Sequence, residues 1–325
     1  MNCSLISEDN YAEMMEGTVL PYLEARKASG FFERKNGEPI YYECYDADHA
    51  EAVIVLVHGF SSSLPKFYET AYYFLQNGYS VRMIQQRGHG RSYRGTGDLS
   101  MILIEDYRDL ILDLRHFMNH IVKPANTESL PLYLYAHSMG GAVSACYLAH
   151  YPSDFKKAVL TSPMMEMNSG QVPMIAAYFL AGVNILTGRG KKPMPGSDPL
   201  NKTPDFENSA ATSRARYDWY FNLQQEHPEY QMCVTPYITA MQLLRLSQEA
   251  MRKQNLPGIR ADVLLLQADN DTYVLPGAQY EFIESIPHGN LIRYAGTKHE
   301  IYRSGNDILE KYWNDIFEFL KRDTP

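Results

Sequence analysis

The sequence has few cysteines and few tryptophans. Only 4 of 325 residues are Cys and 2 are Trp, against 25 Tyr. Cys-x-x-Cys spacing does not occur, so the sequence predicts free thiols in a reducing compartment rather than a disulfide framework. Since no cluster of Cys and His has the spacing of a structural metal site, we also expect neither a metal nor a cofactor. The cysteines are Cys3, Cys44, Cys146 and Cys233.

Excess positive charge and long apolar runs are also missing. The formal net charge is -8, which argues against a nucleic-acid partner. The N-terminal stretch Met1–Asp9 has neither a basic cap nor an apolar run, so we expect no signal peptide. The longest apolar segment, Val172–Leu186, is too short to span a bilayer and contains Pro173 and Asn184. We therefore expect a cytoplasmic protein, with contact at the inner face of a membrane left open; the oligomeric state is not specified.

What the chain does contain is alternation of apolar strands and helices. Hydrophobic residues make up 45% of the sequence and charged residues 21%, enough for a sizeable core. Strands followed by helices predict an α/β fold with a mostly parallel sheet and helices on both faces. The expected strands are 52–57, 79–84, 132–137, 158–163, 261–267 and 290–294, and the expected helices are 66–76, 105–122, 141–150 and 306–321. A helical N-terminal arm (1–32) precedes a hairpin over 31–45 with its turn at Asn36-Gly37.

The alternation is lost between residues 164 and 260. We expect this segment to be an inserted, mainly helical cap above the carboxyl edge of the sheet, with residues 1–163 and 261–325 forming the core. A helix is expected over 236–253. The apolar segment 172–186 has two interpretations that stay open: a lid surface that accepts an acyl chain or rests on lipid, or a helix buried within the insertion.

One stretch carries the pattern of a catalytic serine. An apolar strand ends in Ala136-His137-Ser138-Met139-Gly140 and a run of small residues follows. A strand, a sharp turn with a serine at its apex and a helix form a nucleophile elbow. Its small flanking residues let neighbouring backbone approach closely. The pattern therefore predicts Ser138 as the nucleophile of an acyl transfer.

Two later segments offer the base and the acid that a serine needs. On this type of fold the order along the chain is Ser, then Asp or Glu, then His. Asp271 follows the strand 261–267, and His299 follows the last strand. We expect His299 to be the general base and Asp271 to orient it. Asp269 is the alternative acid.

The oxyanion of the tetrahedral intermediate needs hydrogen-bond donors. We expect the backbone N–H groups of Phe60 and Met139 to supply them. His58, Gly59 and His137 lie beside these groups in the sequence and are candidates for the substrate-binding side of the site, although packing is the favoured role of both histidines. In the Gly-punctuated loop 87–92, Arg87 is either part of an anion clamp or the partner of a nearby carboxylate.

Several of these motifs together resemble a known family. The chain is similar to α/β-hydrolases of the lysophospholipase and monoacylglycerol lipase group, and within it to the bacterial inner-membrane lysophospholipases. The resemblance implies the α/β-hydrolase fold and a Ser138–Asp271–His299 triad with Phe60 and Met139 as oxyanion donors. Gln85 stands where the family usually has Asp, so a carboxylate partner for Arg87 must come from elsewhere. The motifs are Val57-His58-Gly59-Phe60, Gln86–Ser92, Ala136–Gly141, Lys298-His299-Glu300 and, in the insertion, Ser213–Tyr217 and Thr235-Pro236-Tyr237.

These expectations converge on a cofactor-free serine esterase that cleaves a fatty-acyl ester. Lysophospholipid is the first choice of substrate, and monoacylglycerol or a simple carboxylic ester is the second. A proline-type aminopeptidase shares the fold and needs carboxylates in the cap, for which Glu207, Glu226 and Glu229 are available. A haloperoxidase or C–C hydrolase would have a smaller insertion. A non-catalytic scaffold would usually lack a triad member.

Overall fold

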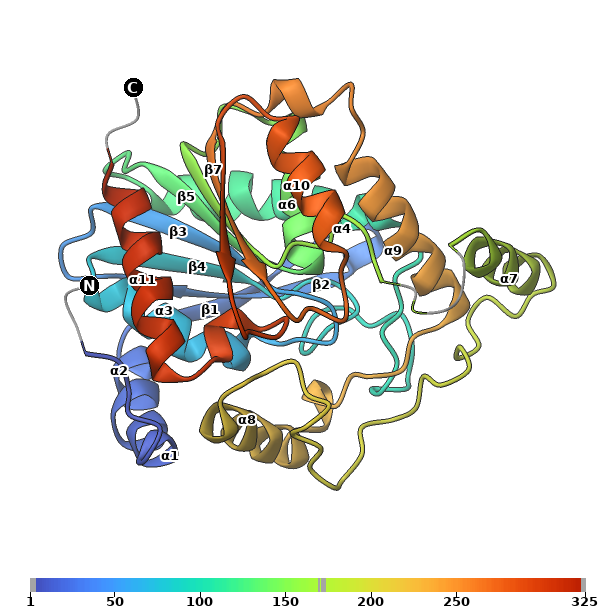
Figure 1. Ribbon diagram of the computed structural model, residues 1–325, viewed down its shortest axis with the longest axis horizontal. Coiled ribbons are helices and arrows are strands. Elements are labelled where there is room, and N and C mark those ends of the chain that lie inside the picture. Colours follow the sequence, from blue (N-terminus) through green and yellow to red (C-terminus); the bar gives the residue numbers. More distant parts are fainter. Residues whose placement is uncertain (1–3, 169, 171–173, 323–325) are drawn as a thin grey trace.

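A computed structural model describes residues 4–168, 170 and 174–322 (Figure 1). Within these residues the strands form one eight-stranded sheet in the order β1-β2-β4-β3-β5-β6-β7-β8. The predicted α/β class is confirmed. The strands are β1 (Lys27–Glu33), β2 (Pro39–Tyr45), β3 (Ala52–Val57), β4 (Tyr79–Ile84), β5 (Leu132–His137), β6 (Lys157–Thr161), β7 (Asp262–Ala268) and β8 (Gly289–Tyr294).

The sheet is parallel from β4 to β8 and antiparallel at the edge formed by β1 and β2. The predicted hairpin is present, and its turn contains Asn36 with φ 59°. Because β3, β5, β6, β7 and β8 are parallel neighbours, their carboxyl ends lie along one edge. The loops after these strands carry the predicted site residues Phe60, Ser138, Asp271 and His299. Sites at this edge are usual for open α/β sheets.

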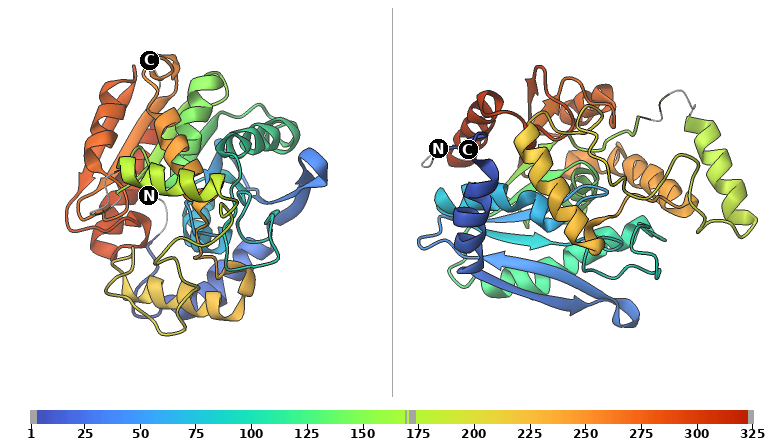
Figure 2. Two further views of the ribbon diagram at one scale, coloured as in Figure 1. Left: turned by 90° about the vertical axis from the view of Figure 1, so that its right-hand side faces the viewer. Right: turned by 90° about the horizontal axis from the view of Figure 1, so that it is seen from below.

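Helices cover both faces of the sheet (Figure 2). Alternate residues of β3 divide between two cores. Val55 and Val57 belong to one core with α4 (Tyr107–Phe117), α6 (Met139–His150), α9 (Tyr237–Ala250) and α10 (Pro276–Glu284). Ile54 and Leu56 belong to the other, with α3 (Tyr68–Gln76), α8 (Arg214–Glu226), α11 (Asn306–Lys321) and the N-terminal arm. This is the period-two pattern of a strand buried on both sides. The helices are α1 (Tyr11–Met14), α2 (Leu20–Glu24), α3 (Tyr68–Gln76), α4 (Tyr107–Phe117), α5 (Lys123–Ala125), α6 (Met139–His150), α7 (Met174–Leu186), α8 (Arg214–Glu226), α9 (Tyr237–Ala250), α10 (Pro276–Glu284) and α11 (Asn306–Lys321).

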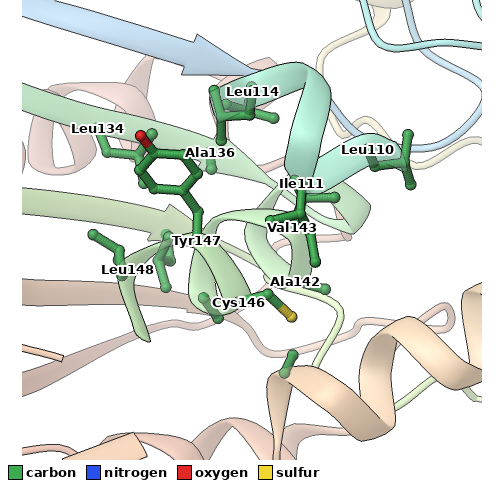
Figure 3. Close-up of a cluster of buried hydrophobic side chains, with 14 of the residues drawn as sticks. Leu110, Ile111, Leu114, Leu134, Ala136, Ala142, Val143, Cys146, Tyr147 and Leu148 are labelled. Carbon is green, nitrogen blue, oxygen red and sulfur yellow. The ribbon is translucent and has the colours of Figure 1, made fainter. Parts of the chain in front are cut away.

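The helix that follows the predicted elbow, α6, is held on all sides. The Tyr147 ring of α6 lies beside Leu134 and Ala136 of β5, and Val143 lies beside Ile111 of α4 (Figure 3). All ten residues of α6 from Met139 to Leu148 are buried, so this part of the helix has no solvent-facing polar side. The rigid packing fixes the position of the helix's first turn relative to the strand ends.

The segment between β6 and β7 contains α7, α8 and α9. Helix α9 packs into the core beside α6, and α8 packs against the N-terminal arm and the opposite face. The boundaries of a separate cap at 164 and 260 remain a prediction.

Helix α7 projects away from the body of the protein (Figures 1 and 2). Ile175 is 83% exposed, Phe179 73% and Leu186 88%. The interpretation of this segment as a buried helix is therefore wrong for these side chains. Among the described residues, no helix is both long and apolar enough to cross a membrane.

Candidate active site

Ser138 occupies the turn between β5 and α6 with backbone angles rarely seen outside glycine. Its φ is 52° and its ψ is -119°. The conformation is fixed by hydrogen bonds: the Ser138 N–H donates to the Thr161 carbonyl at 3.2 Å, and the Ser138 carbonyl accepts from the N–H groups of Gly141 and Met164. Such strain in a non-glycine residue is a feature of functional sites. The serine stands at the N-terminus of α6, where backbone N–H groups favour developing negative charge.

Two glycines allow the backbone around Ser138 to pack this closely. A Cβ atom on Gly140 would lie 2.3 Å from the Val57 carbonyl oxygen, so only glycine lets α6 approach the end of β3. A Cβ atom on Gly59 would lie 3.0 Å from Cβ of Ser138. The loop that carries Gly59 and Phe60 is therefore in direct contact with the serine, and Met139 follows it as the first residue of α6.

His299 and Asp271 are brought together at the same edge. His299 Nδ1 lies 2.7 Å from Asp271 Oδ2, and both side chains are largely buried, 7% and 4% exposed. The other carboxylate oxygen of Asp271 accepts from the backbone N–H groups of Tyr273 and Val274. Asp269, the alternative acid, instead pairs with the exposed Arg293. Of the two candidate acids, only Asp271 contacts the imidazole.

The His299 ring packs directly against the residue that precedes Ser138. The ring centroids of His137 and His299 are 4.8 Å apart, and His137 Nε2 donates to the His299 carbonyl at 3.3 Å. Tyr273 covers another side of the imidazole, with centroids 5.0 Å apart. His137 is buried, and its pKa lies well below its usual range. Loss of solvation is the larger cause, and repulsion from the nearby His299 is the second. A neutral His137 thus packs against the imidazole of His299.

His58 is a buried anchor for the loop beside Ser138. Its Nδ1 donates to the Gly59 carbonyl at 2.8 Å, and its Nε2 accepts from the Gln86 backbone N–H and the Gln85 side-chain amide. Burial lowers the pKa of His58 to about 4, so the ring is neutral near pH 7. Both ring nitrogens already have protein partners. Substrate binding by His58, Gly59 and His137 stays a prediction.

Arg87 is paired with carboxylates. Its guanidinium makes two bonds to Asp113 and one to Glu38. Asp113 and Glu38 supply the carboxylates that Gln85 cannot. Of the two interpretations of Arg87, the structure has the one in which it pairs with nearby carboxylates.

Sequence reasoning missed several features near the site. Tyr273 against His299 and an ion pair between Lys66 and Glu300 were not anticipated, because neither spacing nor periodicity signals a contact between distant loops. It also overlooked a His-x-x-x-His spacing: the rings of His116 and His120 stack with centroids 4.0 Å apart. Within the described part of the chain, no group of three or more His, Cys, Asp or Glu side chains could hold a metal ion.

A strained serine between a parallel strand and a buried helix, on a sheet of this order, defines an α/β-hydrolase. The family model described as serine aminopeptidase, S33 (Hydrolase_4) matches residues 48–305. The chain belongs to this family of hydrolytic enzymes.

Comparison with individual proteins adds relatives of similar length. The chain is 22% identical over 319 residues to a probable lysophospholipase L2 of Haemophilus influenzae, covering 94% of this chain and 99% of that one. Among solved structures, a soluble variant of monoglyceride lipase from Saccharomyces cerevisiae superposes with a TM-score of 0.72 at 17% identity, covering 91% and 95%. A carboxyl esterase from Bacillus coagulans also gives a TM-score of 0.72 at 17% identity, covering 91% and 98%. The two structures bear on the fold alone.

Proposed function

We propose that the protein is a serine esterase that cleaves a single fatty-acyl ester through an acyl-enzyme. The observation that carries the proposal is the 2.7 Å contact between Asp271 and His299, packed against the turn that holds Ser138 in a strained conformation. This combination has the parts of a serine hydrolase: a nucleophile, a base and a group that orients the base.

The chemistry follows from these positions. The Ser138 hydroxyl attacks the ester carbonyl while His299 takes its proton, and Asp271 stabilises the imidazolium that forms. The N–H groups of Phe60 and Met139 donate to the oxyanion. His299 then returns the proton to the leaving alcohol, which leaves an acyl group on Ser138. Water attacks that ester in the second half-reaction, giving the fatty acid and free serine.

Lysophospholipid is the first substrate class and monoacylglycerol the second. The relatives named lysophospholipase L2 and monoglyceride lipase support a lipid ester. Helix α7 supports a lipid surface as the place of action, because its exposed apolar residues are followed by the exposed cations Arg189, Lys191 and Lys192. An apolar face beside basic residues is the pattern of interfacial helices. We propose that the enzyme contacts membranes peripherally through α7.

An aminopeptidase is the alternative suggested by the family description. It would need carboxylates gathered near Ser138 to bind a free amino terminus. Glu226 instead lines a cavity between α8 and the N-terminal arm, and Glu229 contacts His227. Glu207 is exposed in the loop before α8, where its carbonyl accepts from Lys298. This dispersal favours esters over peptides.

The test is Ser138→Ala assayed with p-nitrophenyl butyrate, lysophosphatidylcholine, monoolein and aminoacyl p-nitroanilides. Turnover should fall by about 10⁶-fold, as it does when a triad serine is removed. Ser144→Ala is the matched control, because this serine lies on α6 and its hydroxyl has no hydrogen-bond partner among the described residues. A Ser138→Ala variant that is folded and still active would reject the proposal. Cleavage of only the anilides would favour the aminopeptidase.

A further inference from the structure

Glu300, the residue after His299, is a buried carboxylate held between the buried Arg303 and the largely buried Lys66, whose side chain is 11% exposed. Glu300 itself is 6% exposed. Its Oε1 accepts from Lys66 Nζ at 2.8 Å and its Oε2 from Arg303 Nη1. Burial raises the pKa of Glu300, but Lys66 and Arg303 more than offset this and hold it well below the usual range. The carboxylate is therefore ionised, and all three charges are desolvated.

Each cation comes from a different part of the fold. Lys66 lies in the turn Leu64–Phe67, directly after the segment 58–63 that carries the predicted oxyanion donor Phe60. The start of this turn is held from the other side, because the Leu64 N–H donates to Gln85 Oε1. Through Lys66, Glu300 thus links the segment that carries His299 to the loop that faces Ser138.

Arg303 joins the same carboxylate to helix α8. Its Nη2 donates to the Arg216 carbonyl at 2.7 Å. The Tyr220 ring lies under both cations, 4.7 Å from Lys66 Nζ and 5.3 Å from the Arg303 guanidinium, and its hydroxyl bonds Ser63 Oγ at 2.8 Å. The Glu300 backbone N–H also donates to the Ala210 carbonyl. The Glu300 side chain therefore links the loop after β8 to the loop after β3 directly, and to α8 through Arg303.

Buried ion pairs of this kind seldom add more stability than apolar packing would, because desolvation opposes the attraction, but in some proteins they fix the relative positions of the groups they join. The groups fixed here are those whose spacing matters most for acyl transfer. We infer that Glu300 is a positioning residue that sets the imidazole of His299 and the Phe60 loop in register with each other, with Lys66 and Arg303 as its anchors. The inference rests on the proposed esterase function.

The experiment compares Glu300→Gln, Glu300→Asp and Lys66→Met with wild type, using p-nitrophenyl butyrate well below each melting temperature. Misplacement of catalytic groups by about 1 Å can cost about 10²-fold in rate. We expect kcat per folded molecule of Glu300→Gln to fall by about 10²-fold, with KM changed by less than about threefold. Glu300→Asp keeps the charge and should regain about tenfold. Lys66→Met leaves Glu300 paired with Arg303 and should lose about tenfold in kcat.

Glu249→Gln is the control, because Glu249, near the end of α9, pairs in the same i,i+3 arrangement with Arg252 just beyond the helix. It should leave kcat unchanged. A Glu300→Gln enzyme with lowered melting temperature but unchanged kcat would overturn the inference, as would failure of Asp to restore the rate. Should Glu300→Gln not fold, Lys66→Met decides: unchanged kcat overturns the inference and reduced kcat supports it. Wild type that neither turns over esters nor reacts with a fluorophosphonate would reject the esterase function itself.

Discussion

The Asp271 carboxylate divides its two oxygens between backbone and imidazole, and His299 Nδ1 donates to Oδ2 at 2.7 Å. The oxygen that accepts from Tyr273 N–H and Val274 N–H locks the carboxylate in place. A side chain held at both ends loses little freedom when it orients a base, which is the preorganisation that catalysis needs. The arrangement separates Asp271 from its neighbour Asp269 by position, because Asp269 pairs with Arg293 instead.

The first prediction concerns this division. Asp271→Asn should lower kcat for p-nitrophenyl butyrate by about 10⁴-fold, because an amide that donates to Nδ1 favours the wrong tautomer of His299. Asp269→Asn should change kcat by less than about twofold, since Asp269 pairs with Arg293 at an exposed position and such pairs contribute little. Equal losses in the two variants would contradict the assignment of Asp271.

The second prediction concerns the close approach of α6 to β3. Gly140→Ala should lower the free energy of unfolding by about 3 kcal/mol, because the added Cβ meets the Val57 carbonyl at 2.3 Å and backbone cannot move aside. Gly277→Ala on α10 is the control. Nothing lies within 4 Å of its added Cβ, so it should stabilise the protein by about 0.5–1 kcal/mol. Urea unfolding of both variants measures the difference, and an equally stable Gly140→Ala would refute the steric argument.

The third prediction concerns pH. Burial lowers the pKa of His58 to about 4 and holds the pKa of His89 and of His137 well below the usual value. The unfolded chain therefore binds more protons than the folded one below about pH 6.5, and stability falls as the pH drops. His58 alone should account for a loss on the order of 3 kcal/mol between pH 7 and pH 4.

Two measurements check this expectation. Urea unfolding at pH 7 and pH 5 should give a smaller free energy at pH 5. In proton–carbon spectra of histidine-labelled protein, the signals of His58, His89 and His137 should not titrate between pH 7 and about pH 5. Titration of these three rings near pH 6.5 would show that they are accessible to solvent.

The fourth prediction concerns α7. Ile175→Ser with Phe179→Ser should weaken binding to vesicles of phosphatidylcholine and phosphatidylglycerol by about tenfold or more, since each side chain loses about 1.5–3 kcal/mol of apolar burial. Turnover of water-soluble p-nitrophenyl butyrate should not change. Leu112→Ser on α4, an apolar residue 44% exposed, is the control and should bind like wild type. Vesicle flotation measures the binding, and equal affinity of all three proteins would refute contact through α7.

Local pattern was sufficient for much of the fold. Strands such as 52–57 are continuous apolar runs, and their alternation with helices indicates a parallel sheet whatever the neighbouring contacts are. The last helix was predicted with the bounds that the structure has, Asn306–Lys321, because its apolar period is strong. The prediction for the N-terminal arm was less accurate. The helical part ends at Glu24, because Lys27–Glu33 pairs with β2 as a strand. Strand pairing is non-local and overrode the helical pattern there.

The sequence by itself determined which residues stand at the ends of the strands: Ser138 after β5, Asp271 after β7 and His299 after β8. Small residues around Ser138 and the order along the chain are local properties, so they are visible in one dimension. Only the tertiary structure decided which acid meets the imidazole, that Asp113 and Glu38 pair with Arg87, and that Glu300 joins three segments. These contacts join residues 26 to 234 positions apart, and they exist only because the sheet and the helices packed on it bring distant segments together.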